Sequence, residues 1–187
     1  MEIRLVPCLR YARAFSLVEL TTSLAVTLIL LTIAVPGFRS ITGSSAVSAG
    51  INDMMSHLHL ARHEAIMRGV QVVICPSNDG HKCLDSFQWQ GGFMVFADID
   101  ENRRRGSNEP VLRVHRHDSG RVMILTSKGR KHLVFNATGM SPGSTATITV
   151  CDRTGAVSPK AVILANPGRA RRSTTRADGS PLRCGKK

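Results

Sequence analysis

The sequence has few aromatic residues and few acidic ones. Six Phe, one Trp and one Tyr make up 4% of its 187 residues. Proteins that hold single-stranded nucleic acid stack its bases on aromatic rings, so this composition argues against that mode of binding. Lys and Arg number 25 against 13 Asp and Glu, which gives a formal net charge of +12. The excess of cations predicts an anionic partner: nucleic acid, a membrane surface or a polyanionic sugar.

Catalytic and metal-binding motifs are missing as well. Serine and histidine are plentiful, but the sequence has no nucleophile elbow, phosphate-binding glycine loop or metal-binding helix motif. The cysteines lack the closely spaced pairs of common zinc sites. We therefore predict that the protein is not an enzyme and needs no cofactor or metal ion.

One long apolar run dominates the N-terminal part. Residues 15–35 contain a single ionisable side chain, Glu19. As a helix rising about 1.5 Å per residue, the run can cross the ~30 Å hydrocarbon core of a bilayer. The segment before it, residues 1–14, has more arginine than glutamate, which favours the cytoplasmic side. A carboxylate in such a span is costly, so Glu19 is predicted to have a partner and a function.

No small-x-small cleavage site follows the apolar run, as it would in a secretory signal peptide. Instead Ala-Phe-Ser-Leu-Val-Glu, from Ala14 to Glu19, resembles the signal of type IV pilins and type II secretion pseudopilins. Pro36 matches the family too, whereas Ala14 departs from it, because the family usually has Gly before the cut. The resemblance implies cleavage by a prepilin peptidase between Ala14 and Phe15, methylation of the Phe15 amine, and an assembly role for Glu19.

The same resemblance implies two successive locations for the protein. The protein would be a single-pass protein of the bacterial inner membrane and would then join other pilins in an extracellular type IV pilus. In the filament core, Glu19 would neutralise the N-terminal amine of a neighbouring subunit and so offset the burial of both charges.

After Pro36 the helix is expected to leave the membrane and continue as an amphipathic half. Its apolar residues recur at helical spacing on one face: Val47, Ile51, Met54, Leu58 and Ala65. Gly43-Ser44-Ser45 is predicted to weaken the helix. For His57, His59 and His63 a solvated face is favoured over a metal site, because no third ligand accompanies the pair His59 and His63.

Short strands without intervening helices follow Arg68-Gly69 at a spacing of roughly ten residues, which predicts antiparallel sheets packed as a sandwich or small barrel-like body. The expected strands are 70–75, 93–99, 111–115, 122–126, 131–135, 145–151 and 160–164. The predicted class is α+β: a long N-terminal helix packed on antiparallel β-sheets, as in pilins.

This part of the chain resembles GspH/FimT-type minor pilins through four stretches: Gly91–Asn102, Asn108–Arg113, Phe135–Gly139 and Ile148–Asp152. The expected organisation is a leader peptide 1–14, a transmembrane or filament-core helix 15–37, an amphipathic helix half 38–68, a β-rich globular domain 69–165 and a basic C-terminal tail 166–187.

Loss of the leader removes Cys8 and leaves four cysteines: Cys75, Cys83, Cys151 and Cys184. An even number in an exported domain favours disulfides over free thiols. Three pairings are possible. We favour Cys75–Cys83, which closes a short local loop, together with Cys151–Cys184, which would tie the C-terminal tail to a strand.

The stretch Asp98-Ile99-Asp100-Glu101-Asn102 has oxygen ligands at alternate positions, as the opening of a calcium loop does. These five residues include neither the glycine nor the distal bidentate Glu of an EF-hand. The three arginines at 103–105 would also repel a divalent cation. A hairpin tip is therefore the favoured interpretation.

The C-terminal tail is rich in arginine. Asn166–Ser173 follows the last expected strand, so its arginines are predicted to lie on a loop tethered by Cys151–Cys184. Pro167 and Gly168 are expected to shape a turn that exposes backbone N–H groups. The planar guanidinium donates two hydrogen bonds to phosphate oxygens, and such contacts bind nucleic acid without reading its sequence.

Gly168-Arg169-Ala170-Arg171 resembles a Gly-Arg-x-Arg tail motif of DNA-binding minor pilins. The resemblance implies Gly168, Arg169 and Arg171 as DNA-binding residues, and charge alone adds Arg172 and Arg176. The predicted function is non-specific binding of extracellular double-stranded DNA in natural transformation. The alternative is a structural or priming minor pilin, or a type II secretion pseudopilin, that binds no DNA.

Overall fold

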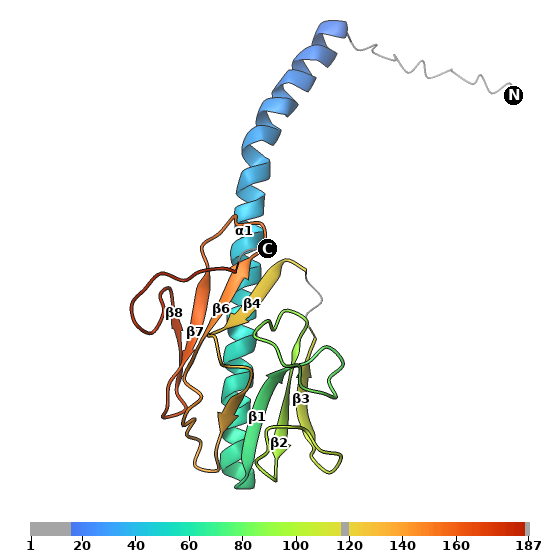
Figure 1. Cartoon of the computed structure of the whole chain (residues 1–187). Helices are drawn as coiled ribbons and strands as arrows, with labels where there is room; N and C mark the ends of the chain where they lie inside the picture. The colour runs from blue at the N-terminus through green and yellow to red at the C-terminus, as the bar shows by residue number, and fades with distance from the viewer. Residues whose placement is uncertain (1–15, 117–119, 186–187) are drawn as a thin grey trace, which may run out of the picture. The chain divides into compact units, whose positions relative to one another are not determined.

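The computed structural model describes residues 16–116 and 120–185 (Figure 1). Within these residues the elements are α1 Leu17–Arg68, β1 Gln71–Pro76, β2 Phe93–Asp98, β3 Val111–His115, β4 Val122–Thr126, β5 Leu133–Phe135, β6 Ala146–Asp152, β7 Lys160–Leu164 and β8 Ala170–Ser173. The chain divides into two compact units, one ending at Phe38 and the other beginning at Arg39.

The first unit holds the apolar part of α1. Its large side chains are exposed, for example Leu28 at 65% and Ile33 at 71%. Glu19 lies in the first helical turn. Among the described residues, α1 is the helix long and apolar enough to cross a membrane, judged by length and composition. Ala14 and Phe15, the predicted cleavage site, lie outside the described residues.

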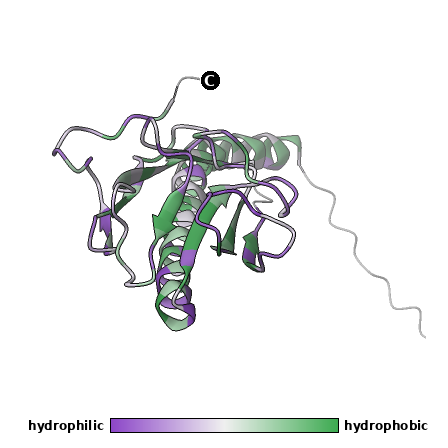
Figure 2. Cartoon of the chain, turned by 60° about the horizontal axis from the view of Figure 1, so that its bottom comes forward, coloured by the Kyte–Doolittle hydropathy of each residue, from purple (hydrophilic) through white to green (hydrophobic). Residues whose placement is uncertain are grey.

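The second unit contains two four-stranded antiparallel sheets around the rest of α1. The strand order is β3-β2-β1-β5 in the first sheet and β4-β6-β7-β8 in the second. Figure 2 shows mostly hydrophobic colouring along the strands. The predicted α+β class, with a long helix packed on antiparallel sheets, is therefore confirmed.

The predicted apolar stripe of α1 forms the centre of the core. Its five members are at most 2% exposed: Val47, Ile51, Met54, Leu58 and Ala65. They belong to one cluster with side chains of both sheets, including Phe93 of β2 and Val150 of β6. Burying each large apolar side chain contributes about 1.5–3 kcal/mol, so this stripe is a major source of stability.

The helix continues through Gly43–Ser45, where the sequence predicts a weak point. Gly43 is buried, and a Cβ atom there would lie 3.0 Å from both Arg121 Nη2 and Asp152 Oδ2. The glycine is explained by this close approach of the second sheet to the helix.

The prediction of a solvated histidine face is wrong for His57. Its ring centroid lies 4.8 Å from that of Phe93 and 5.2 Å from that of His115, and the residue is 6% exposed. Burial lowers the pKa of His57, against the opposing effect of a hydrogen bond from Nδ1 to the Asp53 carbonyl. His59 is exposed, as predicted.

Seven strands lie within two residues of their predicted positions, but β8 was predicted to be a loop. Ala170–Ser173 pairs antiparallel with β7 at the edge of the second sheet. Its sequence, Ala-Arg-Arg-Ser, lacks the apolar alternation of a half-buried strand. An edge strand tolerates such a sequence because only one of its sides joins the sheet and charged side chains can remain in water.

Both favoured disulfides are present. Cys75 is joined to Cys83 with Cα atoms 5.5 Å apart, and Cys151 to Cys184 with Cα atoms 6.0 Å apart. The second bond ties the C-terminal segment to β6, 33 residues earlier in the sequence.

Asp152 ends β6, and its side chain is fully buried. Its Oδ2 accepts hydrogen bonds from the Thr154 hydroxyl at 2.6 Å and the Ala156 N–H at 3.1 Å. Arg121 Nε lies 3.5 Å from Oδ1, and Arg121 Nη2 donates to the Arg39 carbonyl of α1 at 2.7 Å. Burial acts to raise the pKa of Asp152, but the hydrogen bonds and Arg121 outweigh it and hold the pKa below its usual value.

The substitution Asp152→Asn is expected to lower the free energy of unfolding at neutral pH by about 1–3 kcal/mol, because the amide leaves a buried donor without an acceptor. The folded-state pKa is lowered, so the stabilisation by the carboxylate is present above the unfolded value of 3.8 and is lost as the pH falls through the folded value. Denaturant titrations at several pH values should show the difference between variant and wild type shrinking below pH 3.8. A difference independent of pH would contradict this, and Glu101→Gln, which removes a carboxylate from an exposed position, serves as the control.

Candidate nucleic-acid interface

The second sheet has one face on the core and one face directed away from it. On β6, Ile148 and Val150 belong to the core cluster. Because side chains alternate along a strand, Thr147, Thr149 and Cys151 lie on the opposite face, which we call the outer face.

The edge strand β8 divides its two arginines between these faces. Arg171 pairs with Ile163 and Arg172 pairs with Val162. Val162 belongs to the core, so Arg172 lies on the helix side, where its Nη2 donates to Asn52 Oδ1 of α1 at 2.8 Å. Arg171 therefore lies on the outer face.

Arg172 has a cationic neighbour on the helix side. Lys160 Nζ donates to Ser48 Oγ at 3.1 Å, and both cations line a shallow groove with Ile51 and Ser173. Arg172 and Lys160 are thus partly engaged with α1, unlike the arginines of the outer face.

Gly168 is buried in the turn between β7 and β8. Its N–H donates to the Ala165 carbonyl at 2.8 Å, and its carbonyl accepts from Arg62 Nη1 at 3.2 Å. The expectation of a turn with exposed N–H groups is therefore wrong for Gly168. Its φ of 73° and the contact that a Cβ atom would make with the Gly139 carbonyl both require glycine. Gly168 positions the exposed Arg169 that follows it.

The Cys151–Cys184 disulfide fastens the C-terminal segment over the outer face. The segment turns back on itself, with Arg176 N–H donating to the Ser180 carbonyl at 2.9 Å. Between the segment and the sheet runs a groove whose lining includes Lys128, Thr147, Thr149, Arg176 and Arg183.

Five exposed cations of this sheet and its C-terminal segment are together called the outer basic face: Lys128, Arg169, Arg171, Arg176 and Arg183. Lys128, Arg176 and Arg183 line the groove, whereas Arg169 and Arg171 lie at the β8 edge of the sheet. Within residues 16–116 and 120–185, none of the five forms an ion pair with a carboxylate. The acidic Asp178 is held by Ser180, whose hydroxyl and N–H lower its pKa. The arrangement can therefore hold several phosphates of one polyanion.

Sequence reasoning did not select Lys128 or Arg183 for this face. Lys128 lies in the turn after β4, far in sequence from the arginine-rich tail, and no local pattern connects the two. Lys128 and Arg183 nevertheless line one groove, because β4 pairs with β6 and because Cys184 is bonded to Cys151 of β6.

A second group of polar residues lies in the loop between β2 and β3. Asp98, Asp100 and Glu109 each offer a carboxylate oxygen within 4.8 Å of the others, and this is where the described residues could hold a metal ion. Burial raises the pKa of Asp98; hydrogen bonds from Gln71 and the Arg103 N–H oppose this, and Glu109 and Asp100 add to it.

The family model described as type II transport protein GspH matches residues 50–168. In crystals of space group P21, the type IV minor pilin FimU of Pseudomonas aeruginosa has a similar fold, with a TM-score of 0.55 and 19% identity over 71% of this chain and 92% of that chain. The same protein in crystals of space group P65 gives a TM-score of 0.52 and 19% identity over 67% of this chain and 91% of that chain. A search of characterised proteins finds no significant match. The family match ends at Gly168, so four of the five cations of the outer basic face lie beyond it.

The substitution Gly168→Ala is expected to destabilise the protein by at least about 2 kcal/mol, because it adds a backbone clash to the cost of a positive φ. Gly179→Ala is the matched control: Gly179 also has a positive φ, of 82°, but nothing lies within 4 Å of its would-be Cβ. Thermal unfolding followed by circular dichroism should give a clearly lower midpoint for Gly168→Ala than for Gly179→Ala. Equal midpoints would show that the turn can relax away from Gly139.

Proposed function

This chain belongs to the GspH family of minor pilins and pseudopilins, and we propose that within it the protein is a DNA-binding minor pilin of the FimT type. The family is structural and non-enzymatic. The proposed ligand is extracellular double-stranded DNA, bound without sequence preference to support its uptake in natural transformation. The outer basic face is the observation that carries this proposal.

The chemistry of this face suits a phosphate backbone. Guanidinium groups bind phosphate oxygens in pairs, and Thr147 and Thr149 add hydroxyl groups beside them. Each phosphate neutralised releases counterions, which supplies affinity without reading bases. The scarcity of aromatic residues fits a duplex better than a single strand.

The disulfide supports binding by reducing the entropy lost on association. Arg176 and Arg183 lie on a segment without helix or long strand, and such a segment would otherwise have to be ordered by the ligand. The Cys151–Cys184 bond already holds it over the sheet.

Assembly into a filament is the second part of the proposal. Prepilin peptidase would cut between Ala14 and Phe15 and methylate Phe15, while the apolar part of α1 rests in the inner membrane. In the pilus, neighbouring pilins would cover its exposed side chains, and Glu19 would pair with the N-terminal amine of a neighbour. Retraction of the pilus would then carry bound DNA inward.

The alternative function is a structural or priming minor pilin, or a type II secretion pseudopilin. One observation favours it: the family match covers residues 50–168 and leaves out most of the outer basic face. In that case the arginines would contact a neighbouring subunit or the membrane.

Binding of duplex DNA across a salt series separates the two functions. For the full-length protein in detergent micelles, log K is expected to fall linearly with log salt. Arg169→Gln with Arg171→Gln should flatten the slope by about two units, because two phosphate contacts are lost. The matched control, Arg103→Gln with Arg104→Gln, makes the same change of charge at exposed positions of the first sheet.

If the protein does not bind duplex DNA at low salt, the DNA-binding proposal is wrong and the structural alternative is favoured. An equal effect of the control pair would show that net charge, and not the outer basic face, attracts DNA. The single variants Arg171→Gln and Arg172→Gln test the face directly, because these neighbours on β8 lie on opposite sides of the sheet. A larger loss of DNA affinity for Arg172→Gln than for Arg171→Gln would place the DNA on the helix side of the sheet.

Processing is tested by intact-mass analysis of protein purified from a host that contains a prepilin peptidase. The expected product begins at Phe15 and carries one N-methyl group. Ala14→Gly should be processed at least as completely, since it restores the usual family residue. A product that begins elsewhere would contradict the proposed cleavage site.

A further inference from the structure

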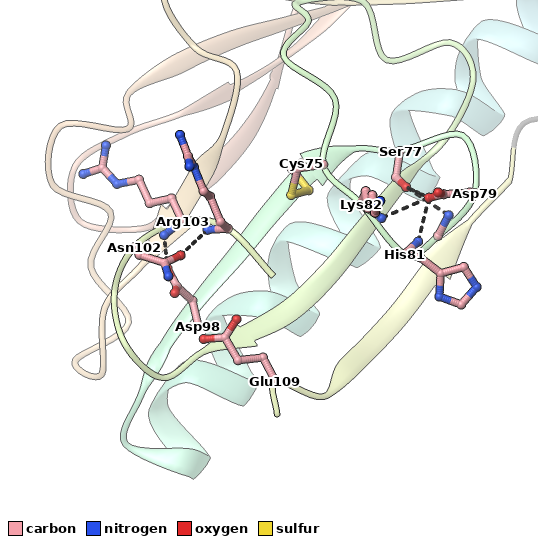
Figure 3. The surroundings of a disulfide bond; sticks show 12 residues. Cys75, Ser77, Asp79, His81, Lys82, Asp98, Asn102, Arg103 and Glu109 are labelled. Carbon is pink, nitrogen blue, oxygen red and sulfur yellow. Dashed lines mark hydrogen bonds between the residues drawn. A yellow bond between two sulfur atoms is a disulfide. The ribbon is translucent and has the colours of Figure 1, made fainter. Parts of the chain in front are cut away.

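The loop between β2 and β3 gathers three carboxylates from positions 98, 100 and 109. Asp98 ends β2 and is 0% exposed, and Glu109 precedes β3 and is 5% exposed. Asp100 is exposed at the edge of the group. One oxygen of each lies within 4.8 Å of the others, and Figure 3 shows the carboxylates of Asp98 and Glu109 beside each other at the base of the loop.

Asp98 has an oxygen that the protein leaves without a donor. Its Oδ2 accepts from Gln71 Nε2 at 2.6 Å and from the Arg103 N–H at 2.9 Å. Its Oδ1 is buried, and no donor of the described residues reaches it. A buried carboxylate oxygen without a partner is costly, so its retention calls for a ligand.

Positive side chains do not neutralise the group. In the described part of the chain, none of the three carboxylates forms an ion pair with Arg, Lys or His. Arg103, Arg104 and Arg105 instead line a shallow pocket with Lys82 and His132. Arg105 Nε donates to the backbone carbonyl of Glu109 at 3.2 Å, not to its carboxylate.

Glu109 is held in place by the loop itself. Its Oε1 accepts from the Ile99 N–H and its Oε2 from the Gly106 N–H, each at 2.7 Å. Each carboxylate oxygen has two lone pairs, so these bonds orient the group and leave a lone pair on each oxygen for a further ligand.

We propose that Asp98, Asp100 and Glu109 bind a divalent cation, and that the ion is Ca²⁺. A cation would supply the missing partner of Asp98 Oδ1 and relieve the repulsion among three carboxylates. All-oxygen ligands exclude the ions that prefer nitrogen or sulfur. An irregular loop with water access on the Asp100 side suits the flexible coordination of Ca²⁺ better than the strict octahedron of Mg²⁺.

The sequence argued against such a site because the EF-hand glycine and distal glutamate were judged missing and three arginines follow. That judgement is wrong for the glutamate: Glu109 is the twelfth residue counted from Asp98, the position of the bidentate glutamate in an EF-hand loop, whereas Arg103 occupies the glycine position. In the fold, Glu109 lies beside Asp98 and Asp100, and the arginine side chains line a pocket with Lys82 and His132. The ion would pin the start and the end of the β2–β3 loop together. This proposal is independent of DNA binding, since the outer basic face lies on the other sheet.

Calorimetric titration of the full-length protein in detergent, stripped with EDTA, tests the proposal. We expect one Ca²⁺ per chain with a dissociation constant of about 0.1–1 mM, as in extracellular calcium modules. Saturating Ca²⁺ should raise the unfolding midpoint by several degrees, because the ion binds the folded state alone. Mg²⁺ at the same concentration should have a clearly smaller effect. Absence of saturable uptake, or equal effects of Mg²⁺ and Ca²⁺, would overturn the assignment.

Variants locate the site. Asp100→Asn should weaken Ca²⁺ binding at least about tenfold without affecting folding, since Asp100 is exposed. Glu101→Gln is the matched control: it removes the same charge from an exposed neighbour outside the cluster and should bind Ca²⁺ like the wild type. Equal weakening in both would show general electrostatic attraction and overturn the site.

Asp98→Asn gives a second, independent readout of stability. In EDTA its unfolding midpoint should equal or exceed that of the wild type, because one of the mutually repelling charges is gone. Addition of Ca²⁺ should then raise the midpoint of the wild type and leave that of the variant unchanged. A variant that still gains stability from Ca²⁺ would exclude Asp98 as a ligand.

Discussion

Packing of both sheets on one apolar stripe of α1 is the constraint on which the rest of this structure depends. Leu58 and its neighbours in the stripe are buried by strands from both sheets at once. Both sheets therefore turn one face to α1. The other face of the first sheet packs a second, smaller apolar cluster, and the other face of the second sheet carries the C-terminal segment. The outer basic face is built on that segment and on β8, and the carboxylate group uses a loop of the first sheet.

Covalent and steric details then place the charges. The Cys151–Cys184 disulfide holds a polar C-terminal segment that has little apolar surface of its own to bury. Gly168 lets the β7–β8 turn approach the Gly139 carbonyl and so fixes where Arg169 emerges. Gly43 similarly lets Arg121 and Asp152 approach α1. A disulfide and two glycines at close contacts therefore set how the second sheet, its turns and its C-terminal segment are placed.

Class and individual function reside in different parts of the chain. The family match spans residues 50–168 and identifies a minor pilin or pseudopilin. Four of the five cations of the outer basic face follow Gly168, in or beside β8 and on the tethered segment. Under the proposed function, the part of the chain that matches the family supplies the packed helix and most of both sheets, while the residues after it supply most of the DNA-binding cations.

The sequence by itself determined the apolar helix, its buried stripe and seven of the strands, and it favoured, among three possible pairings, the disulfides that the structure has. These follow from local periodicity and spacing, which the chain carries wherever it folds. Only the tertiary structure decided that Ala170–Ser173 is an edge strand, that Arg171 and Arg172 face opposite ways, and that Lys128 and Arg183 line one groove. Local patterns are silent on these points, because strand pairing and loop closure bring together residues whose separation in sequence has no fixed period.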